Sequence, residues 1–60
     1  MPWSATHFPP SMLHLPEPVR GKAIEIANAL LEEGYEEGRC IRIAIAQAKR
    51  WAEARGIPVA

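Results

Sequence analysis

A glycine at position 34 separates two stretches in which apolar residues recur at the spacing of an α-helix. Glycine adopts the left-handed backbone conformation that ends a helix without steric cost, so Gly34 is a natural helix stop. Glu36 and Glu37 follow it, and acidic residues are favoured in the first turn of a helix. The pattern therefore predicts two helices joined by a short turn.

The first helix is expected over residues 16–33, because proline is tolerated in a first turn and Pro16 and Pro18 lie at its start. Steps of three and four residues separate most of its apolar positions, which indicates a helix and not a strand. These positions are Val19, Ala23, Ile26, Ala27, Leu30 and Leu31. The same periodicity places four polar residues on the opposite, solvent-facing side, namely Lys22, Glu25, Asn28 and Glu32.

The second helix is expected over residues 36–55, with Gly56 and Pro58 ending it. Its apolar face is wide, and alanines at positions 44 and 48 permit the close approach of the first helix. The face consists of Cys40, Ile41, Ala44, Ile45, Ala48, Trp51 and Ala52. Ile43 lies off this face, so it needs cover from some other element or from a second chain.

Residues 1–15 are rich in proline, which lacks an N–H group and prevents a long regular element. The segment also contains large apolar side chains, which a disordered tail would lack. We therefore expect an extended N-terminal arm that lies across the helices. The predicted fold is all-α: one small domain over residues 1–60, an antiparallel two-helix hairpin with this arm packed on it. Dimerisation into a four-helix bundle is the alternative way to cover the wide face of the second helix.

A chain of sixty residues buries only about 60% of the surface that its unfolded form exposes, so it usually needs support beyond its own core. The one cysteine, Cys40, excludes an internal disulfide and fits a reducing compartment. No cluster of Cys, His and carboxylates has the spacing of a metal site, and no residue set suggests catalysis. We expect no catalytic, cofactor or metal site.

The formal net charge is zero, but the charge is unevenly distributed. Residues 1–38 carry −4 and residues 39–60 carry +4, a polarity that suits the pairing of complementary surfaces. No apolar run approaches the length of about 18 residues that a membrane-spanning helix requires. The N-terminus lacks a basic region followed by an apolar segment, so we expect no signal peptide and a cytoplasmic protein.

Two groups of residues are candidates for binding. Surplus apolar and aromatic side chains predict self-association as a homodimer or a protein partner; they are Trp3, Phe8, Tyr35 and Ile43. The basic side of the second helix predicts, as the alternative, phosphate contacts with a nucleic acid; it consists of Arg39, Arg42, Lys49 and Arg50. The acidic turn and the zero net charge oppose this alternative.

Three blocks carry a resemblance over nearly the whole chain: "MPW", "LPEPVRGKAIEIANALLEEGYEEGR" and "IAIAQAKRW". They resemble short bacterial proteins of the YdaT-like type. More distantly, the Leu-Pro-x-x-Val entry, the Asn28–Ala29 pair and the helix ending near Trp51 are similar to the ChaB family, which is described as regulating cation transport. The chain lacks the charged C-terminus of that family. The resemblance implies a small helical bacterial protein, and we expect a non-enzymatic interaction or regulatory module.

Overall fold

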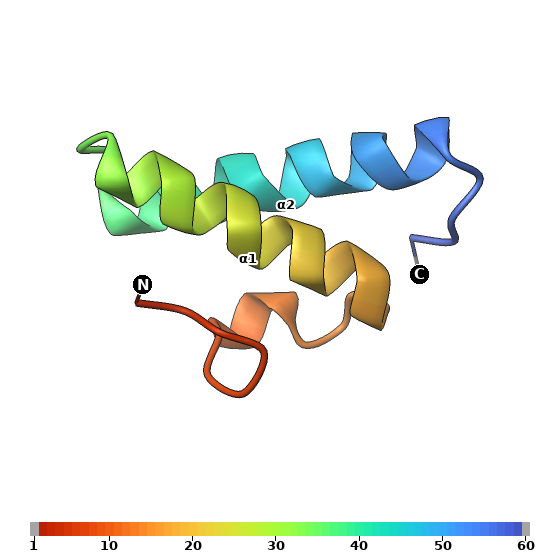
Figure 1. Cartoon of the computed structure of the whole chain (residues 1–60), viewed down its shortest axis with the longest axis horizontal. Helices are drawn as coiled ribbons and strands as arrows, with labels where there is room; N and C mark the ends of the chain where they lie inside the picture. The colour runs from red at the N-terminus through yellow and green to blue at the C-terminus, as the bar shows by residue number, and fades with distance from the viewer. Residues whose placement is uncertain (1, 60) are drawn as a thin grey trace.

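The computed structural model describes residues 2–59 and contains two long helices, α1 (Glu17–Glu32) and α2 (Glu37–Ala54), preceded by a single 3₁₀ turn, η1 (Pro10–Met12). The two helices pack side by side as a hairpin, and the N-terminal segment runs along one side of it (Figure 1). Among the described residues there is no strand, only an isolated β-bridge between Ser4 and His7. The helical hairpin predicted from the sequence is confirmed, with helix bounds within one residue of those expected.

The turn between the helices is a Schellman motif centred on Gly34. Gly34 has a φ of +99° and donates its N–H to the Leu31 carbonyl at 3.0 Å. The N–H of Tyr35 reaches back to the Leu30 carbonyl at 3.2 Å, so two carbonyls at the end of α1 are satisfied. Gly56, with a φ of +71°, ends α2 in the same way, and the N–H of Ile57 donates to the Ala52 carbonyl at 2.8 Å.

The two acidic residues after the turn stabilise the start of α2. Glu36 is the N-cap, and its carboxylate accepts a hydrogen bond from the Arg39 N–H at 3.3 Å. Glu37 is the first helical residue, where its charge faces the positive end of the helix dipole. Both carboxylates therefore stabilise the first turn of α2 through local interactions.

Small side chains on α2 bring the helices close together. Cys40, Ala44, Ala48 and Ala52 are fully buried, and on α1 they meet a face that includes Val19, Ala23 and Ala27. Since alanine adds little thickness to a helix, close approach lets backbone and side-chain atoms of both helices fill the interior. The half-buried apolar residues around this core are Phe8, Ile26, Leu30, Leu31, Ile41, Ile45, Trp51, Ile57 and Val59.

The N-terminal segment contributes three residues to the core. Trp3, Met12 and Leu15 are 8%, 0% and 2% exposed. The segment is not extended throughout, because the Ser4–His7 bridge closes a tight turn and Pro10 opens the 3₁₀ turn that buries Met12. Proline fixes φ near the value that a helical turn requires, which explains why the prolines here produce turns rather than a straight strand.

Asn28 is not on the solvent-facing side of α1, and the prediction that it would be is wrong. Its side chain is 7% exposed and pairs with the backbone of Trp3, 25 residues earlier. The Trp3 N–H donates to Asn28 Oδ1 at 3.2 Å, and Asn28 Nδ2 donates to the Trp3 carbonyl at 3.0 Å. Ile24, which the apolar pattern left out, is also buried in the core. α1 therefore has a second buried side, toward the N-terminal segment.

Candidate interaction surface

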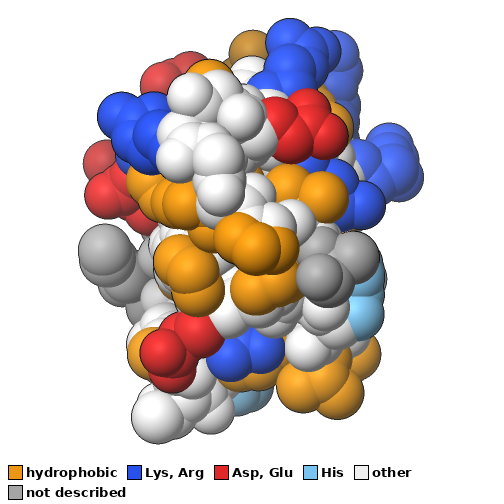
Figure 2. Space-filling model, turned by 90° about the vertical axis from the view of Figure 1, so that its right-hand side faces the viewer, with side chains coloured by type: hydrophobic (Ala, Val, Ile, Leu, Met, Phe, Trp, Pro, Cys, Tyr) orange, Lys and Arg blue, Asp and Glu red, His pale blue; other side chains and the backbone are white. Residues whose placement is uncertain are grey.

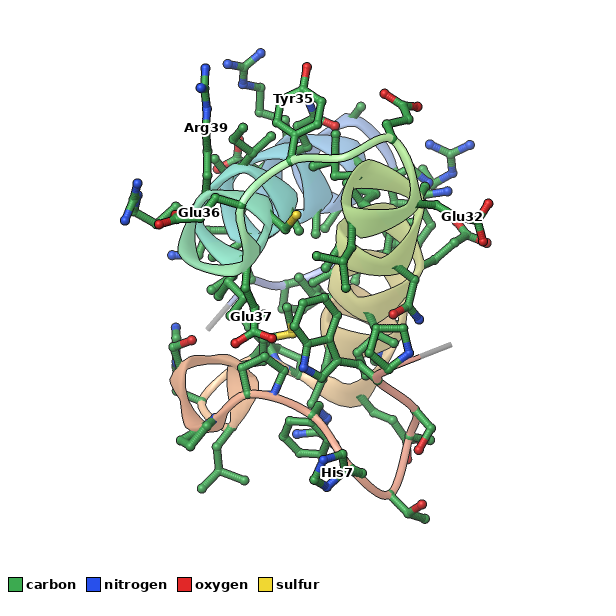
Figure 3. All side chains as sticks on the ribbon, turned by 90° about the vertical axis from the view of Figure 1, so that its left-hand side faces the viewer. His7, Glu32, Tyr35, Glu36, Glu37 and Arg39 are labelled. Atoms are coloured by element: carbon green, nitrogen blue, oxygen red, sulfur yellow. The ribbon has the colours of Figure 1, made fainter. Side chains whose placement is uncertain are left out.

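The N-terminal segment covers one face of the hairpin and leaves the other face open. Viewed along the hairpin from its turn, α1 and α2 lie side by side with the N-terminal segment below both (Figure 3). Glu37 points down toward that segment, whereas Tyr35 points up, away from it. The uncovered side is thus the side toward which Tyr35 points.

A contact between Lys22 and Trp51 fixes which residues meet on the uncovered side. Lys22 Nζ lies 5.5 Å from the centroid of the Trp51 ring, which joins the two helices at that level. Helical neighbours recur every four residues, and the helices run antiparallel. One turn along, Ile26 is therefore level with Gln47, and a second turn brings Leu30 level with Ile43.

We call this surface the open face and define it by five residues, Ile26, Leu30, Tyr35, Ile43 and Trp51. All are half-buried except Tyr35, which is 38% exposed. Ile26, Leu30 and Trp51 pack against the buried core of the chain. Ile43 differs from them, because it belongs neither to that core nor to the described residues that pack on it. The open face is therefore an apolar strip along the seam of the hairpin, without a covering element among residues 2–59.

Cations lie over both aromatic rings of the open face. Arg39 is 5.5 Å from the centroid of Tyr35, and Arg55 is 5.0 Å from the centroid of Trp51, the ring that Lys22 also contacts. Such contacts hold long basic side chains against apolar surface while their charged groups stay in water. The strip thus has basic groups at its rim and apolar groups in its middle, the arrangement of a binding surface.

The structure separates the residues that the sequence analysis grouped as partner-binding. Tyr35 and Ile43 lie on the open face, whereas Trp3 and Phe8 lie on the covered side. Trp3 is a buried core residue, and the half-buried Phe8 has the Arg20 guanidinium 4.9 Å from its ring centroid. The most exposed large hydrophobic side chain in the described part of the chain is Leu13, at 67%, a residue not predicted to bind a partner.

The basic residues of the nucleic-acid alternative lie along the side of α2 that faces neither α1 nor the N-terminal segment. Arg39, Arg42 and Arg50 are exposed and Lys49 is half-buried. Within residues 2–59 the only ion pair is Lys22 with Glu25 at 2.7 Å, so none of these four has a carboxylate partner there. They are free to contact external anions.

The two ends of the hairpin carry opposite charge. At the turn, four acidic residues stand against Arg39 and Arg42, which leaves −2. The opposite end has a balance of +2, since its five basic side chains outnumber Glu17, Glu25 and Glu53. Figure 2 views this opposite end, where hydrophobic side chains occupy the middle and lysine and arginine side chains gather above them.

The remaining reactive side chains do not form a site in the described part of the chain. Cys40 is fully buried, and its Sγ donates to the Tyr35 carbonyl at 3.5 Å. His7 and His14 are exposed. No group of three or more His, Cys, Asp or Glu side chains in residues 2–59 is placed to hold a metal ion. Neither α1 nor α2 is both long and apolar enough to cross a lipid bilayer.

Comparison with known proteins identifies one bacterial relative. Over 53 residues, 88% of this chain, the sequence is 60% identical to a Bacillus subtilis protein named "Uncharacterized protein YdaT". The chain is similar to YdaT. The resemblance to YdaT-like proteins is thus confirmed, and the chain spans 35% of the length of YdaT. No protein-family model matches the chain, and no solved structure matches it. The ChaB resemblance stays a prediction.

Proposed function

We propose that this protein is a non-enzymatic interaction module of bacterial type that self-associates as a homodimer through the open face. The observation that carries the proposal is Ile43, a half-buried isoleucine outside the chain's own core. It lies level with Leu30 in the middle of an apolar strip that no element in residues 2–59 covers. A second copy of the chain supplies an apolar surface of the same kind.

The charge distribution favours an antiparallel arrangement of the two copies. A two-fold axis through the middle of the open face places the acidic turn of one copy near the basic end of the other. The turn end of each copy, with a charge of −2, then attracts the +2 end of the other copy, so the attraction acts twice per dimer. A parallel dimer would bring ends of like charge together and is therefore disfavoured. The product is a four-helix bundle with an N-terminal segment on each outer side.

Self-association also meets the stability requirement of a small chain. A domain of this length buries about 60% of the surface that its unfolded chain exposes, which leaves a narrow margin of stability. Covering the open face removes Ile43 and parts of Leu30 and Trp51 from water, at about 25 cal/mol for each Å² of apolar surface. Dimerisation therefore stabilises the fold as well as creating a larger binding unit.

Replacing Ile43 with glutamate is expected to shift the protein from dimer to monomer. The substitution places a charge in the middle of the apolar strip, twice per dimer, and should weaken association at least tenfold. Light scattering over a concentration series measures this, with circular dichroism to verify that the helices remain. Ala5→Glu is the matched control, because Ala5 is exposed on the opposite side of the molecule.

The dimer should weaken as salt is added, because the charged ends contribute to it. A wild-type protein that stays monomeric up to millimolar concentration would refute the homodimer. An Ala5→Glu variant that dissociates as readily as Ile43→Glu would locate the contact elsewhere.

Nucleic-acid binding is a second candidate, favoured because the basic residues of α2 have no carboxylate partner within residues 2–59. If all four bind phosphates, log Kobs should fall with log salt concentration with a slope of about −3.6 on duplex DNA. Arg42→Gln should make that slope shallower by about one. Fluorescence anisotropy with labelled duplex and single strands measures both. No binding at low salt eliminates this function.

The proposal includes a regulatory role in the cytoplasm. A buried, unpaired Cys40 is compatible with a reducing compartment, where thiols stay free. A ChaB-like resemblance would imply the same class of small helical regulator. Catalysis is not part of the proposal, because the described residues bring no nucleophile, base and orienting group together.

A further inference from the structure

A groove on the covered side of the hairpin lies between the N-terminal segment and the beginning of α2. It has a volume of about 280 Å³. Its walls come from both segments and include Trp3, His7, Phe8, Pro9, Glu37 and Ile41. Because the open face is on the other side of the hairpin, this groove is independent of the self-association proposed above.

Glu37 gives the groove its electrostatic character. Among residues 2–59 no lysine or arginine lines it, and Glu37 is the only acidic side chain that does. The carboxylate has no hydrogen bond or ion pair with any group in residues 2–59, and it points toward the N-terminal segment (Figure 3). The carboxylate is exposed, so it can accept hydrogen bonds from an external cation while it also faces the helix dipole.

The aromatic walls narrow the choice of cation. Trp3 is held by its two backbone hydrogen bonds to Asn28, so its indole is a fixed part of the groove. Phe8 and Ile41 add apolar surface to the walls of the groove, and the Glu37 side chain is exposed. A planar guanidinium can lie flat against an aromatic ring and present two parallel N–H donors to a carboxylate, a paired geometry that a compact ammonium lacks.

We propose that this groove binds an arginine side chain of a partner polypeptide, with Glu37 accepting its hydrogen bonds and the accessible edges of the aromatic wall contacting its guanidinium. The chain itself shows that its aromatic residues accept guanidinium groups: Arg20, Arg39 and Arg55 lie 4.9, 5.5 and 5.0 Å from the centroids of Phe8, Tyr35 and Trp51. Arg20 does not line the groove, and its Nη1 donates to the Leu15 carbonyl at 3.2 Å. Its fixed positive charge opposes a second cation near Phe8, so binding depends on Glu37.

The test titrates ¹⁵N-labelled protein with the peptide Gly-Gly-Arg-Gly-Gly and with the same peptide carrying citrulline, the neutral isostere of arginine. The arginine peptide should shift the indole N–H of Trp3 and the amides of Glu37 and Ile41. The citrulline peptide should bind at least fivefold more weakly. Glu37→Gln should weaken the arginine peptide by at least fivefold, while leaving the helices intact because glutamine is tolerated in a first turn.

Glu33→Gln is the matched control, since Glu33 belongs to the acidic turn but does not line the groove. If Glu33→Gln and Glu37→Gln weaken the binding of the arginine peptide equally, the peptide is attracted to the acidic turn as a whole. That result would overturn the proposal. Equal binding of the arginine and citrulline peptides, or no shifts at millimolar peptide, would overturn it too. Ile43→Glu should bind the arginine peptide as well as the wild type does, so failure here and failure of the homodimer are distinguishable.

Discussion

Replacing Trp3 with alanine is expected to lower the free energy of unfolding by about 3–5 kcal/mol. Trp3 is 8% exposed and packs in the same core as Met12, Val19 and Cys40, although it lies near the beginning of the chain. The substitution removes the largest aromatic side chain from that core and leaves space that the proline-restricted segment cannot collapse to fill. A chain of 60 residues has a total stability of only about 3–9 kcal/mol, so this variant should be near its unfolding threshold.

Urea denaturation measures the change, with circular dichroism at the helix band as the first probe. The fluorescence of Trp51 is a second probe, because this residue remains when Trp3 is absent. Leu13→Ala is the control. Leu13 is apolar and belongs to the same segment but is 67% exposed, so its loss should change stability by no more than about 0.5 kcal/mol. Equal effects of the two substitutions would show that the N-terminal segment does not pack on the hairpin in solution.

The hairpin was predictable because its signals are local. Gly34 has the positive φ that its position after an apolar periodic stretch predicted, and Gly56 ends α2 by the same mechanism. Glu36 and Glu37 lie at the start of α2, where a favourable dipole contact was expected, and Glu36 also caps the helix. Each of these signals depends on neighbours within four or five residues, so the sequence alone carries enough information to place them.

The packing of the N-terminal segment was less predictable because it depends on contacts distant in sequence. A polar residue in a helical pattern is assigned to solvent by default, which is why Asn28 was misplaced. Its partners are backbone groups 25 residues away, and backbone groups have no sequence signature. Ile24 was missed for the same reason, since a helix covered on two sides has a wider apolar face than one periodic stripe.

Of the two candidate surfaces, the open face was partly predictable from the sequence and the groove at Glu37 was not. Ile43 was recognised from its position off the apolar stripe, which helical geometry alone defines. The groove at Glu37 could not be found from the sequence, because its walls come from two segments whose relative position is set by Trp3 and Asn28. Short-range rules identify an unpaired side chain on one helix, whereas a groove between segments requires the tertiary structure.

Asn28→Ala is expected to lower the free energy of unfolding by about 2–3 kcal/mol, through two hydrogen bonds rather than through lost volume. It removes the acceptor at 3.2 Å from the Trp3 N–H and the donor at 3.0 Å from the Trp3 carbonyl, both at a buried site. Each buried backbone group left without a partner costs about 1–3 kcal/mol. The shallow depression beside Asn28, lined by Pro2, Leu31 and Glu32, lets water reach the vacated position and lowers this cost. Urea denaturation measures the loss, and Glu32→Ala, an exposed site one turn along α1, should change stability by less than about 0.5 kcal/mol.

The double variant Trp3→Ala/Asn28→Ala decides whether the N-terminal segment docks as one unit. If the segment stays in place in each single variant, the indole packing and the backbone hydrogen bonds are separate contributions and their losses add. If either substitution releases the segment, the first change already removes the contacts that the second would delete. The double variant should then lose less than the sum, by about 1 kcal/mol or more. We expect the second result, because Asn28 holds Trp3 by its backbone while the indole fills the core, so neither contact persists once the segment has moved away. Additive losses would show instead that Trp3 packs without help from Asn28.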